Sequence, residues 1–419
     1  MKISLIQPGR NNLKYLKWSY DSIRKNQGKH EVEICVADDF SNDGTWDWCQ
    51  EMMQKDSNFK CMRNGGPTRL GHTILYDRLV NNVATNDICM IYHADMYLCP
   101  GALDAIESNL EEKTIVSLTR IEPPLHPEGP EKEVHDFGIE PEEFQEQKLL
   151  EWVESTHHGA WSNLYDKITE GVFAPWAFYK KDFQEINGHD PLYAPQSKED
   201  SDIFNRFQLN GIKFKQTWRG FVYHMTCRGS RFADGAQRNP DGQVFMKNRE
   251  TAEWLTQNEK ATRNFIRKWG HFVKHDEFLK PIIPPKYDVG FIIKNCNDQL
   301  LEVLEPWCSR IYSDADWEGY IKSEQPNTKF NMKKRCHSLT GLDKNDILVE
   351  IDGQDFDNRD FEYIQQLPEI IVNDRFLGSH IHLARHKKEL GELFELGSLK
   401  ITINNLETFE KELIVCKEY

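Results

Sequence analysis

The chain has 419 residues, more than one typical domain holds, so two domains are expected. Its 67 acidic residues exceed the 52 Lys and Arg residues, and the formal net charge of −15 argues against a general binder of polyanions. The 10 cysteines lack paired spacing, no stretch approaches the roughly twenty apolar residues of a membrane span, and the N-terminal segment carries no charged-then-apolar leader. These features predict a reduced, cytoplasmic protein without a transmembrane segment.

Short apolar runs alternate with helical patterns in the N-terminal part of the chain. Residues 2–8 and 32–36 predict strands, and residues 13–23 between them predict a helix. A further apolar run at residues 88–92 predicts another strand. Strands that alternate with helices predict an α/β fold with a doubly wound sheet and a Rossmann-like nucleotide-binding half.

Acidic residues follow the ends of these predicted strands. Asp38 and Asp39 come just after the strand at 32–36, and Asp95 comes just after the strand at 88–92. In an open parallel sheet, ligands bind at the carboxyl ends of the strands. We therefore expect these acids to point into a cleft, although an ordinary exposed loop is the alternative for the first pair taken alone.

A third acidic segment, residues 196–207, combines an acidic turn with an amphipathic helix. Glu199, Asp200 and Asp202 lie where this helix begins. Acids at a helix start complement the helix dipole, which explains one acid well but three together less well. A chemical role for this segment is therefore favoured.

Taken together, the motifs in residues 1–235 resemble those of the inverting family 2 glycosyltransferases with the GT-A fold. They occur in the family's order: Pro8 near the end of the first strand, the loop 38–45, the Gly- and Arg-containing loop 64–69, the D-x-D-type strand end 93–95, the pair Glu199-Asp200 and the downstream His224. The resemblance implies a metal-assisted glycosyltransferase that moves a sugar from a nucleotide-diphosphate sugar to a hydroxyl acceptor with inversion.

The resemblance also implies roles for individual residues. Asp200 would be the base that takes the acceptor's proton in a single displacement, and Glu199 would position Asp200 or the acceptor. A divalent cation, Mn or Mg, would neutralise the leaving diphosphate and would be held by Asp95 and His224. The resemblance also implies a set of residues that bind the nucleotide-sugar. They are Pro8, Asp38, Asp39, Arg69, Asp95, Arg228 and Arg231.

His93 stands where the family usually has the first acid of its D-x-D motif. Either one carboxylate plus His224 holds the ion with water and phosphate oxygens, or metal dependence is weakened. Imidazole suits Mn better than Mg. For His93 itself, a hydrogen-bonded side chain near a strand end is favoured over direct ligation. The pair Asp38-Asp39 suits the imide proton of uracil, so a UDP-linked donor is expected, while other bases stay open.

Two further segments bear on the acceptor. Trp176 offers a flat face for a sugar ring or a base, although aromatic residues at such positions more often belong to the core. The Pro- and Glu-rich insertion at residues 122–154 is expected to be solvated or to frame the acceptor cleft.

The C-terminal part begins with a basic segment, residues 260–274, which predicts a partly amphipathic helix. Such a helix can bind phosphates of a lipid surface or a nucleic acid, but a solvated helix packed on the catalytic domain is favoured. The predicted domains are 1–240, catalytic; 241–286, a basic helix and a Pro-rich linker; and 287–419, a smaller α/β domain with strands near 287–293, 347–351, 370–372 and 401–403 and a helix near 300–304. This last domain resembles no family, and acceptor recognition and oligomerisation are its two expected roles.

The acceptor and two other function classes stay open. A glycan is the favoured acceptor, and DNA with hydroxymethylated bases is the alternative, supported by the basic segment and opposed by the acidic balance. A nucleotidyltransferase would carry a Gly-rich basic loop after the first strand, of which residues 8–10 are a thin version. A non-catalytic nucleotide-sugar or nucleic-acid binding module is supported by His93 in place of an acid and by the basic helix.

Overall fold

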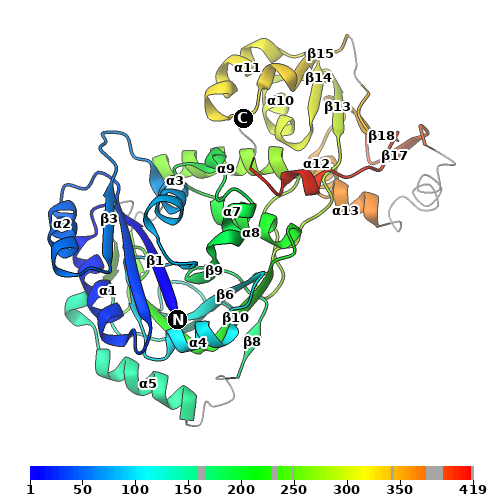
Figure 1. Cartoon of the computed structure of the whole chain (residues 1–419). Helices are drawn as coiled ribbons and strands as arrows, with labels where there is room; N and C mark the ends of the chain where they lie inside the picture. The colour runs from blue at the N-terminus through cyan, green and yellow to red at the C-terminus, as the bar shows by residue number, and fades with distance from the viewer. Residues whose placement is uncertain (159–165, 229–234, 248–249, 341–343, 374–389, 417–419) are drawn as a thin grey trace. The chain divides into compact units, whose positions relative to one another are not determined.

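The computed structural model describes residues 1–158, 166–228, 235–247, 250–340, 344–373 and 390–416. The chain divides into two compact units, one formed by Met1–Leu255 with His275–Pro281 and the other by Thr256–Lys274 with Ile282–Tyr419 (Figure 1). Among the described helices, none combines the length and apolar character that a bilayer crossing requires.

The first unit is built on a ten-stranded mixed sheet whose main path runs β3-β2-β1-β4-β9-β6-β10-β5. Strand β1 pairs in parallel with β2 and β4, whereas β9 is antiparallel to both of its neighbours, β4 and β6. The prediction of an α/β fold with a mixed sheet is confirmed. The strands are β1 (Lys2–Gly9), β2 (Glu31–Asp38), β3 (Phe59–Arg63), β4 (Ile88–Ile91), β5 (Met96–Leu98), β6 (Thr114–Glu122), β7 (Lys132–Val134), β8 (Ile168–Thr169), β9 (Trp176–Tyr179) and β10 (Lys213–His224).

Helices pack against this sheet through their apolar stripes. Helix α1 buries Leu16 and Ile23, which lie two turns apart on one face, and it packs beside β5. Helix α2 lies beside β3, and α4 packs on β10 (Figure 1). The helices are α1 (Leu13–Asn26), α2 (Thr45–Lys55), α3 (Gly71–Arg78), α4 (Ala102–Asn109), α5 (Glu146–His158), α7 (Lys180–Glu185) and α8 (Glu199–Leu209).

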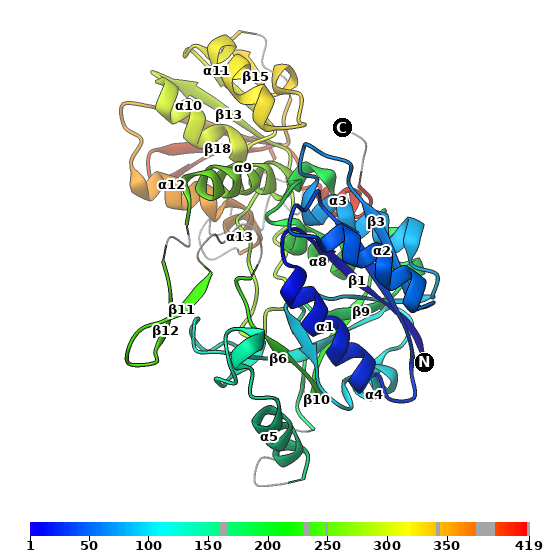
Figure 2. The same cartoon turned by 90° about the vertical axis from the view of Figure 1, so that its left-hand side faces the viewer.

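The insertion at residues 122–154 differs from the expectation of a solvated segment. Helix α5 buries Leu149 and Val153 against Phe221 and Tyr223 of β10. The Pro and Glu content of the segment masked these two apolar positions, which lie four residues apart on one helix face. The last part of the insertion, residues 146–154, therefore belongs to a helix that packs on β10. Figure 2 shows α5 below β6 and β10.

The second unit contains a six-stranded sheet of order β15-β14-β13-β16-β18-β17. Strands β13 to β16 pair in parallel, and β18 is antiparallel to β16 and β17. A second α/β region is thus confirmed, and three of the predicted strands correspond to β13, β16 and β18. The elements are α9 (Ala252–Trp269), β13 (Val289–Lys294), α10 (Asp298–Leu304), β14 (Arg310–Ser313), α11 (Trp317–Glu324), β15 (Cys336–Ser338), β16 (Ile347–Asp352), α12 (Asn358–Gln365), α13 (Leu367–Val372), β17 (Leu393–Leu396) and β18 (Leu399–Ile403).

The predicted strand at residues 370–372 is wrong, because this segment is the end of helix α13. Pro368 lies in the first turn of that helix, where its fixed φ and missing N–H are tolerated. Ile370 and Ile371 are both buried, so the short apolar run reflects burial rather than a strand.

The basic segment forms most of α9, but its charges do not make a free cationic face. Arg267 is fully buried and its guanidinium contacts the carboxylates of Glu305, at 2.6 Å, and Glu324. Arg263 pairs with Glu324 as well, at 3.0 Å. The expectation of a solvated or phosphate-binding helix is therefore wrong for these two arginines, since both are neutralised within the second unit.

Candidate functional site

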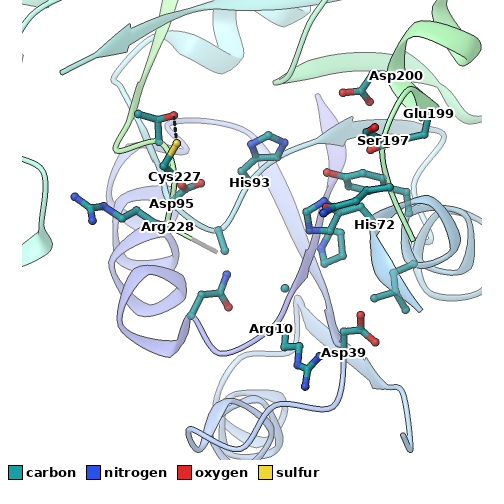
Figure 3. Close-up of a pocket in the computed structure, with 18 of the residues that line it drawn as sticks. Arg10, Asp39, His72, His93, Asp95, Ser197, Glu199, Asp200, Cys227 and Arg228 are labelled. Atoms are coloured by element: carbon teal, nitrogen blue, oxygen red, sulfur yellow. Dashed lines mark hydrogen bonds between the residues drawn. The ribbon is translucent and has the colours of Figure 1, made fainter. Parts of the chain in front are cut away.

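A pocket of about 360 Å³ lies in the first unit where β1, β2, β4 and β10 end (Figure 3). In Figure 3, Asp39 and Arg10 lie at the lower end of the pocket, His93 in the middle and Asp200 at the upper end. Segments far apart in sequence thus meet at one edge of the sheet, as expected for an α/β fold. The residues that line the pocket are Pro8, Gly9, Arg10, Asn12, Asp39, Arg69, His72, Leu75, Tyr76, His93, Ala94, Asp95, His126, Gln196, Ser197, Glu199, Asp200, His224, Thr226, Cys227 and Arg228.

Asp39 and Asp38 have different environments although they are adjacent. Asp39 lines the pocket, and its carboxylate accepts hydrogen bonds from Asn64 Nδ2 at 2.7 Å and from the backbone N–H groups of Leu70 and Gly71 at 3.0 and 2.9 Å. Asp38 is fully buried and does not line the pocket. Its carboxylate accepts from the Ser41 backbone N–H at 3.0 Å and pairs with Arg63 at 3.0 Å.

The prediction that Asp38 also contacts the nucleoside is therefore corrected. Consecutive residues of a strand point to opposite faces, and Asp38 is the last residue of β2. Its side chain orders the turn that carries Asp39.

Arg69, which was predicted to lie near the nucleotide, lies beside Asp39. Its Nε is 3.6 Å from the Asp39 carboxylate, and burial lowers the pKa of the guanidinium while Asp39 acts to raise it. The loop of Arg69 approaches another part of the pocket wall at Gly71. There φ is +76°, and a Cβ would lie 2.2 Å from the carbonyl oxygen of Pro195. Only glycine permits this approach.

Three side chains that suit a metal ion meet in the middle of the pocket. His93, Asp95 and His224 each place one ligand atom within 4.8 Å of the others. His224 Nε2 is 3.4 Å from the Asp95 carboxylate. Burial lowers the pKa of His93 to about 3, and His224 adds to the effect. His93 is therefore neutral, with a lone pair to offer, and it lies beside the two residues that the sequence predicted as ligands.

Glu122 was not predicted as a site residue, yet it contacts Nδ1 of His224, whereas Nε2 is the ring nitrogen near Asp95. Its carboxylate is 3% exposed and lies 2.8 Å from His224 Nδ1. Burial acts to lower the pKa of His224, but the carboxylates of Asp95 and Glu122 outweigh it and raise this pKa to about 9. A carboxylate on one ring nitrogen directs the other toward a metal ion, which is the usual arrangement around ligating histidines.

The acids of α8 lie at the other side of the pocket. Glu199 and Asp200 are the first two residues of the helix, and both line the pocket. Although Asp200 is exposed at its surface, desolvation by the surrounding protein raises its pKa, while His189 and Arg120 act to lower it. The Asp200 carboxylate is thus a stronger base than an aspartate in water.

Arg228 closes the pocket beside Asp95. Its Nη1 donates to the carbonyl oxygen of Ala236 at 3.0 Å and pairs with Glu140 at 3.1 Å. Within the described residues, its Nε and Nη2 are buried without a hydrogen-bond partner. These N–H groups leave donor capacity beside the predicted metal ligand Asp95.

Two other predicted residues are not found in the pocket. Trp176 is 1% exposed and packs among Phe178, Phe204 and Phe207 in the core, so the prediction that its ring stacks on an acceptor is corrected. Arg231 lies outside the described residues. Sequence reasoning missed Arg10, His72, Tyr76, His126, Ser197 and Cys227, which line the pocket without belonging to any of the recognised motif positions.

Comparison with known proteins identifies the first part of the chain. Residues 4–186 match the family model described as Glycosyl transferase family 2. Three solved structures resemble the chain at low identity: GalNAc-T7 with UDP, GalNAc and Mn2+ (15% identity, 54% of this chain and 44% of that chain, TM-score 0.39), S. aureus TarS 1–349 in complex with UDP (15%, 53% and 60%, 0.38) and S. aureus TarS (14%, 54% and 37%, 0.38).

The chain thus spans less than two thirds of each of these structures, and at these TM-scores the likenesses carry no further argument. No curated protein matches the chain.

Proposed function

Because residues 4–186 are a glycosyltransferase domain of family 2, we propose that this protein transfers a sugar from a nucleotide-diphosphate sugar, with UDP as the favoured nucleotide, to a hydroxyl acceptor. The observation that carries the proposal is the meeting of Asp39, Asp95, Asp200 and Arg228 around one pocket of about 360 Å³. These side chains come from four separate segments, and each offers a group that one part of such a reaction needs.

The nucleoside end of the donor is assigned to Asp39, with Pro8 and Arg69 beside it. A carboxylate offers about four lone-pair sites, and three of those on Asp39 already accept hydrogen bonds. The remaining site is free for an N–H such as the imide of uracil. Arg69 partly offsets the charge of Asp39 and remains close to the phosphates.

The diphosphate is assigned to Asp95, His224 and Arg228. A carboxylate and two imidazoles within 4.8 Å of one another fit a divalent cation, with Mn favoured over Mg by the imidazole nitrogens. A bound Mn2+ would neutralise the charge that develops on the leaving diphosphate. Arg228 has two nitrogens, Nε and Nη2, left to donate to the same phosphate oxygens.

Asp200 is assigned as the base of a single displacement with inversion. Its carboxylate takes the proton of the acceptor hydroxyl as the acceptor oxygen bonds to the anomeric carbon. The bond from that carbon to the diphosphate oxygen breaks, and the nucleoside diphosphate leaves with the electron pair. Glu199, next to Asp200 in the first turn of α8, positions the base or the acceptor.

The acceptor follows from weaker observations, and a glycan is favoured over DNA. The DNA alternative drew on the basic segment, whose arginines Arg263 and Arg267 are neutralised by Glu324 and Glu305. The formal net charge of −15 also opposes binding to a polyanion.

Calorimetric titration with nucleoside diphosphates and their sugars, with and without Mn2+, tests the proposal. One nucleotide is expected to bind in a metal-dependent manner, and donor hydrolysis is expected to follow for its sugar. Asp200→Asn is expected to abolish turnover while donor affinity stays unchanged, and Ser201→Ala in the same helical turn serves as the control. Turnover that survives in Asp200→Asn contradicts the assignment of the base.

The metal assignment has its own variants. Asp95→Ala is expected to weaken metal-dependent donor binding, and normal Mn-dependent turnover by this variant would remove Asp95 from the site. His224→Ala is expected to raise the Mn2+ concentration that turnover requires, and an unchanged titration would exclude His224 as a ligand. No binding of any nucleotide would contradict the whole proposal.

A further inference from the structure

A second cavity, of about 390 Å³, adjoins the pocket near the end of β6. It shares His126, His224 and Thr226 with the pocket, so the two spaces adjoin at these residues. Cavities of roughly 300–1,000 Å³ hold small ligands. The rest of the lining comes from β6, β7 and the Pro-rich loop between them, and it consists of Arg120, Glu122, Pro127, Glu131 and Lys132.

The charges of this lining balance one another. Arg120 lies 3.2 Å from Glu122 and 3.3 Å from Glu131, and Lys132 lies 3.0 Å from Glu122 and 3.5 Å from Glu131. Among these four side chains the two cations and the two anions therefore balance, and His224 of the same lining is paired with Glu122 and with Asp95 of the pocket. A phosphate or sulfate group entering it would meet two carboxylates. A hydroxyl group, in contrast, donates to a carboxylate and accepts from an ammonium or guanidinium group, so it can use both signs of charge.

The Arg120 side chain is held in a fixed geometry. Its Nε faces the Glu122 carboxylate at 3.2 Å. Its guanidinium lies over the ring of Phe173, 5.3 Å from the ring centre. The end of β7 is held beside β6 because the backbone N–H of His135, just after β7, donates to the Glu122 carbonyl at 2.9 Å. A lining held in this way is organised before a ligand arrives.

The cavity is also close to the groups assigned to the reaction. His224, assigned to the diphosphate, forms part of its wall. Arg120 is among the groups that act electrostatically on Asp200, the assigned base. Asp39, assigned to the nucleoside, lies at the opposite end of the pocket from Asp200 (Figure 3). A donor whose nucleoside lies at Asp39 and which extends past His93 would therefore bring its sugar toward Asp200.

We propose that the second cavity is the acceptor subsite and that it binds a neutral, hydroxyl-rich carbohydrate. The inference rests on the proposed glycosyl transfer and specifies its acceptor class. One hydroxyl of the carbohydrate loses its proton to Asp200 and bonds to the anomeric carbon of the donor, and the nucleoside diphosphate leaves. The other hydroxyls bind Glu131, Lys132 and Arg120.

Glu131 is chosen for the test because it lines the second cavity and not the pocket. Its ion pairs among the described residues are with Arg120 and Lys132, and none is with His224. Glu131→Gln removes the charge at nearly constant size, and Glu131→Phe fills the space. Glu128→Gln, an exposed position on the same loop, is the matched control. Each protein is assayed for binding of the nucleoside diphosphate with Mn2+, for donor hydrolysis, and for transfer to a panel of neutral glycosides, anionic glycans and hydroxymethylated DNA.

We expect wild-type protein and Glu128→Gln to transfer the sugar to neutral glycosides. Glu131→Gln is expected to raise the acceptor KM about 10-fold or more with little change in kcat, and Glu131→Phe to lose transfer while it still binds and hydrolyses the donor. Transfer to anionic glycans or DNA in preference, unchanged KM in both variants, or donor hydrolysis without transfer to any neutral glycoside would each overturn the inference. Absence of donor binding and hydrolysis in wild-type protein would instead contradict the proposed function itself.

Discussion

Replacement of Glu122 by alanine tests how the metal-ligand set is held in place. The Glu122 carboxylate accepts from His224 Nδ1 at 2.8 Å, so Nε2 is turned toward Asp95. Without the carboxylate, the imidazole is free to change its tautomer and to rotate. Loss of such a supporting group typically lowers metal affinity about 10- to 100-fold, and we expect Glu122→Ala to weaken Mn2+ binding within that range.

The same change also affects stability. Lys132, 4% exposed at its side chain, loses a partner at 3.0 Å, and breaking a buried ion pair typically costs about 3–5 kcal/mol. Glu131 remains 3.5 Å from Lys132, so the loss is expected near the lower end of this range. Glu122→Gln keeps an oxygen that can accept from His224, and its Mn2+ affinity should fall less than that of Glu122→Ala.

Mn2+ affinity is measured by calorimetry in the absence of donor, together with thermal unfolding of the metal-free protein. The unfolding data separate a misfolded variant from a folded one with a disordered ligand. Glu131→Gln is the matched control, because it removes a neighbouring carboxylate that does not contact His224. A folded Glu122→Ala protein that binds Mn2+ as tightly as wild type refutes the reasoning.

Three further predictions concern other parts of the chain. Desolvation raises the pKa of Asp200 above its unfolded value, so the stability contributed by this group is complete below about pH 4 and is lost as pH rises through the raised pKa; because Asp200 is exposed, solvent screens the effect, and Asp200→Asn should have a slightly higher melting temperature than wild type at pH 7–8 and an equal one near pH 4, whereas a lower value at pH 7–8 would contradict the sign. Arg267→Ala removes one of the two guanidinium partners of the buried Glu305, at 2.6 Å, while Arg335 stays at 2.5 Å, so the unfolding free energy should fall by about 3 kcal/mol in urea denaturation, and a loss under 1 kcal/mol would show that Arg335 alone neutralises Glu305. Gly71→Ala combines a positive φ with a 2.2 Å approach to the backbone of Pro195, so donor affinity and melting temperature should both fall, and an unchanged nucleotide titration would show that the loop adjusts without cost.

The sequence predicted the site residues that follow from local rules. Asp39, Asp95 and His224 all lie at or just after the end of a strand, where a side chain faces the ligand edge of the sheet. The difference between Asp38 and Asp39 follows from the two-residue period of a strand, which turns the side chain of Asp38, the last residue of β2, away from the pocket that Asp39 lines.

Glu122 illustrates what a sequence reading could not reach. It is separated from His224 by 102 residues, and its neighbours in the chain are Pro-rich, which is typical of a solvated loop. The contact arises because β6 and β10 pair in parallel, with Tyr223 opposite Ile121, so the next residue of each strand lies at the same end. A residue's partner across a sheet is set by register, and register is not visible in a single strand.

The basic segment shows the same limit for charge. Counting Lys and Arg along α9 suggested a phosphate-binding face, but Arg267 is paired with Glu305 and Glu324, which are 38 and 57 residues further along the chain. Charge partners this distant are brought together only by the fold. Because Arg263 and Arg267 are paired with acids, they do not form a cationic surface on a chain whose formal net charge is −15. The overall charge and the balanced lining of the second cavity then favour the same conclusion, since each disfavours a polyanionic acceptor and neither opposes a neutral glycan.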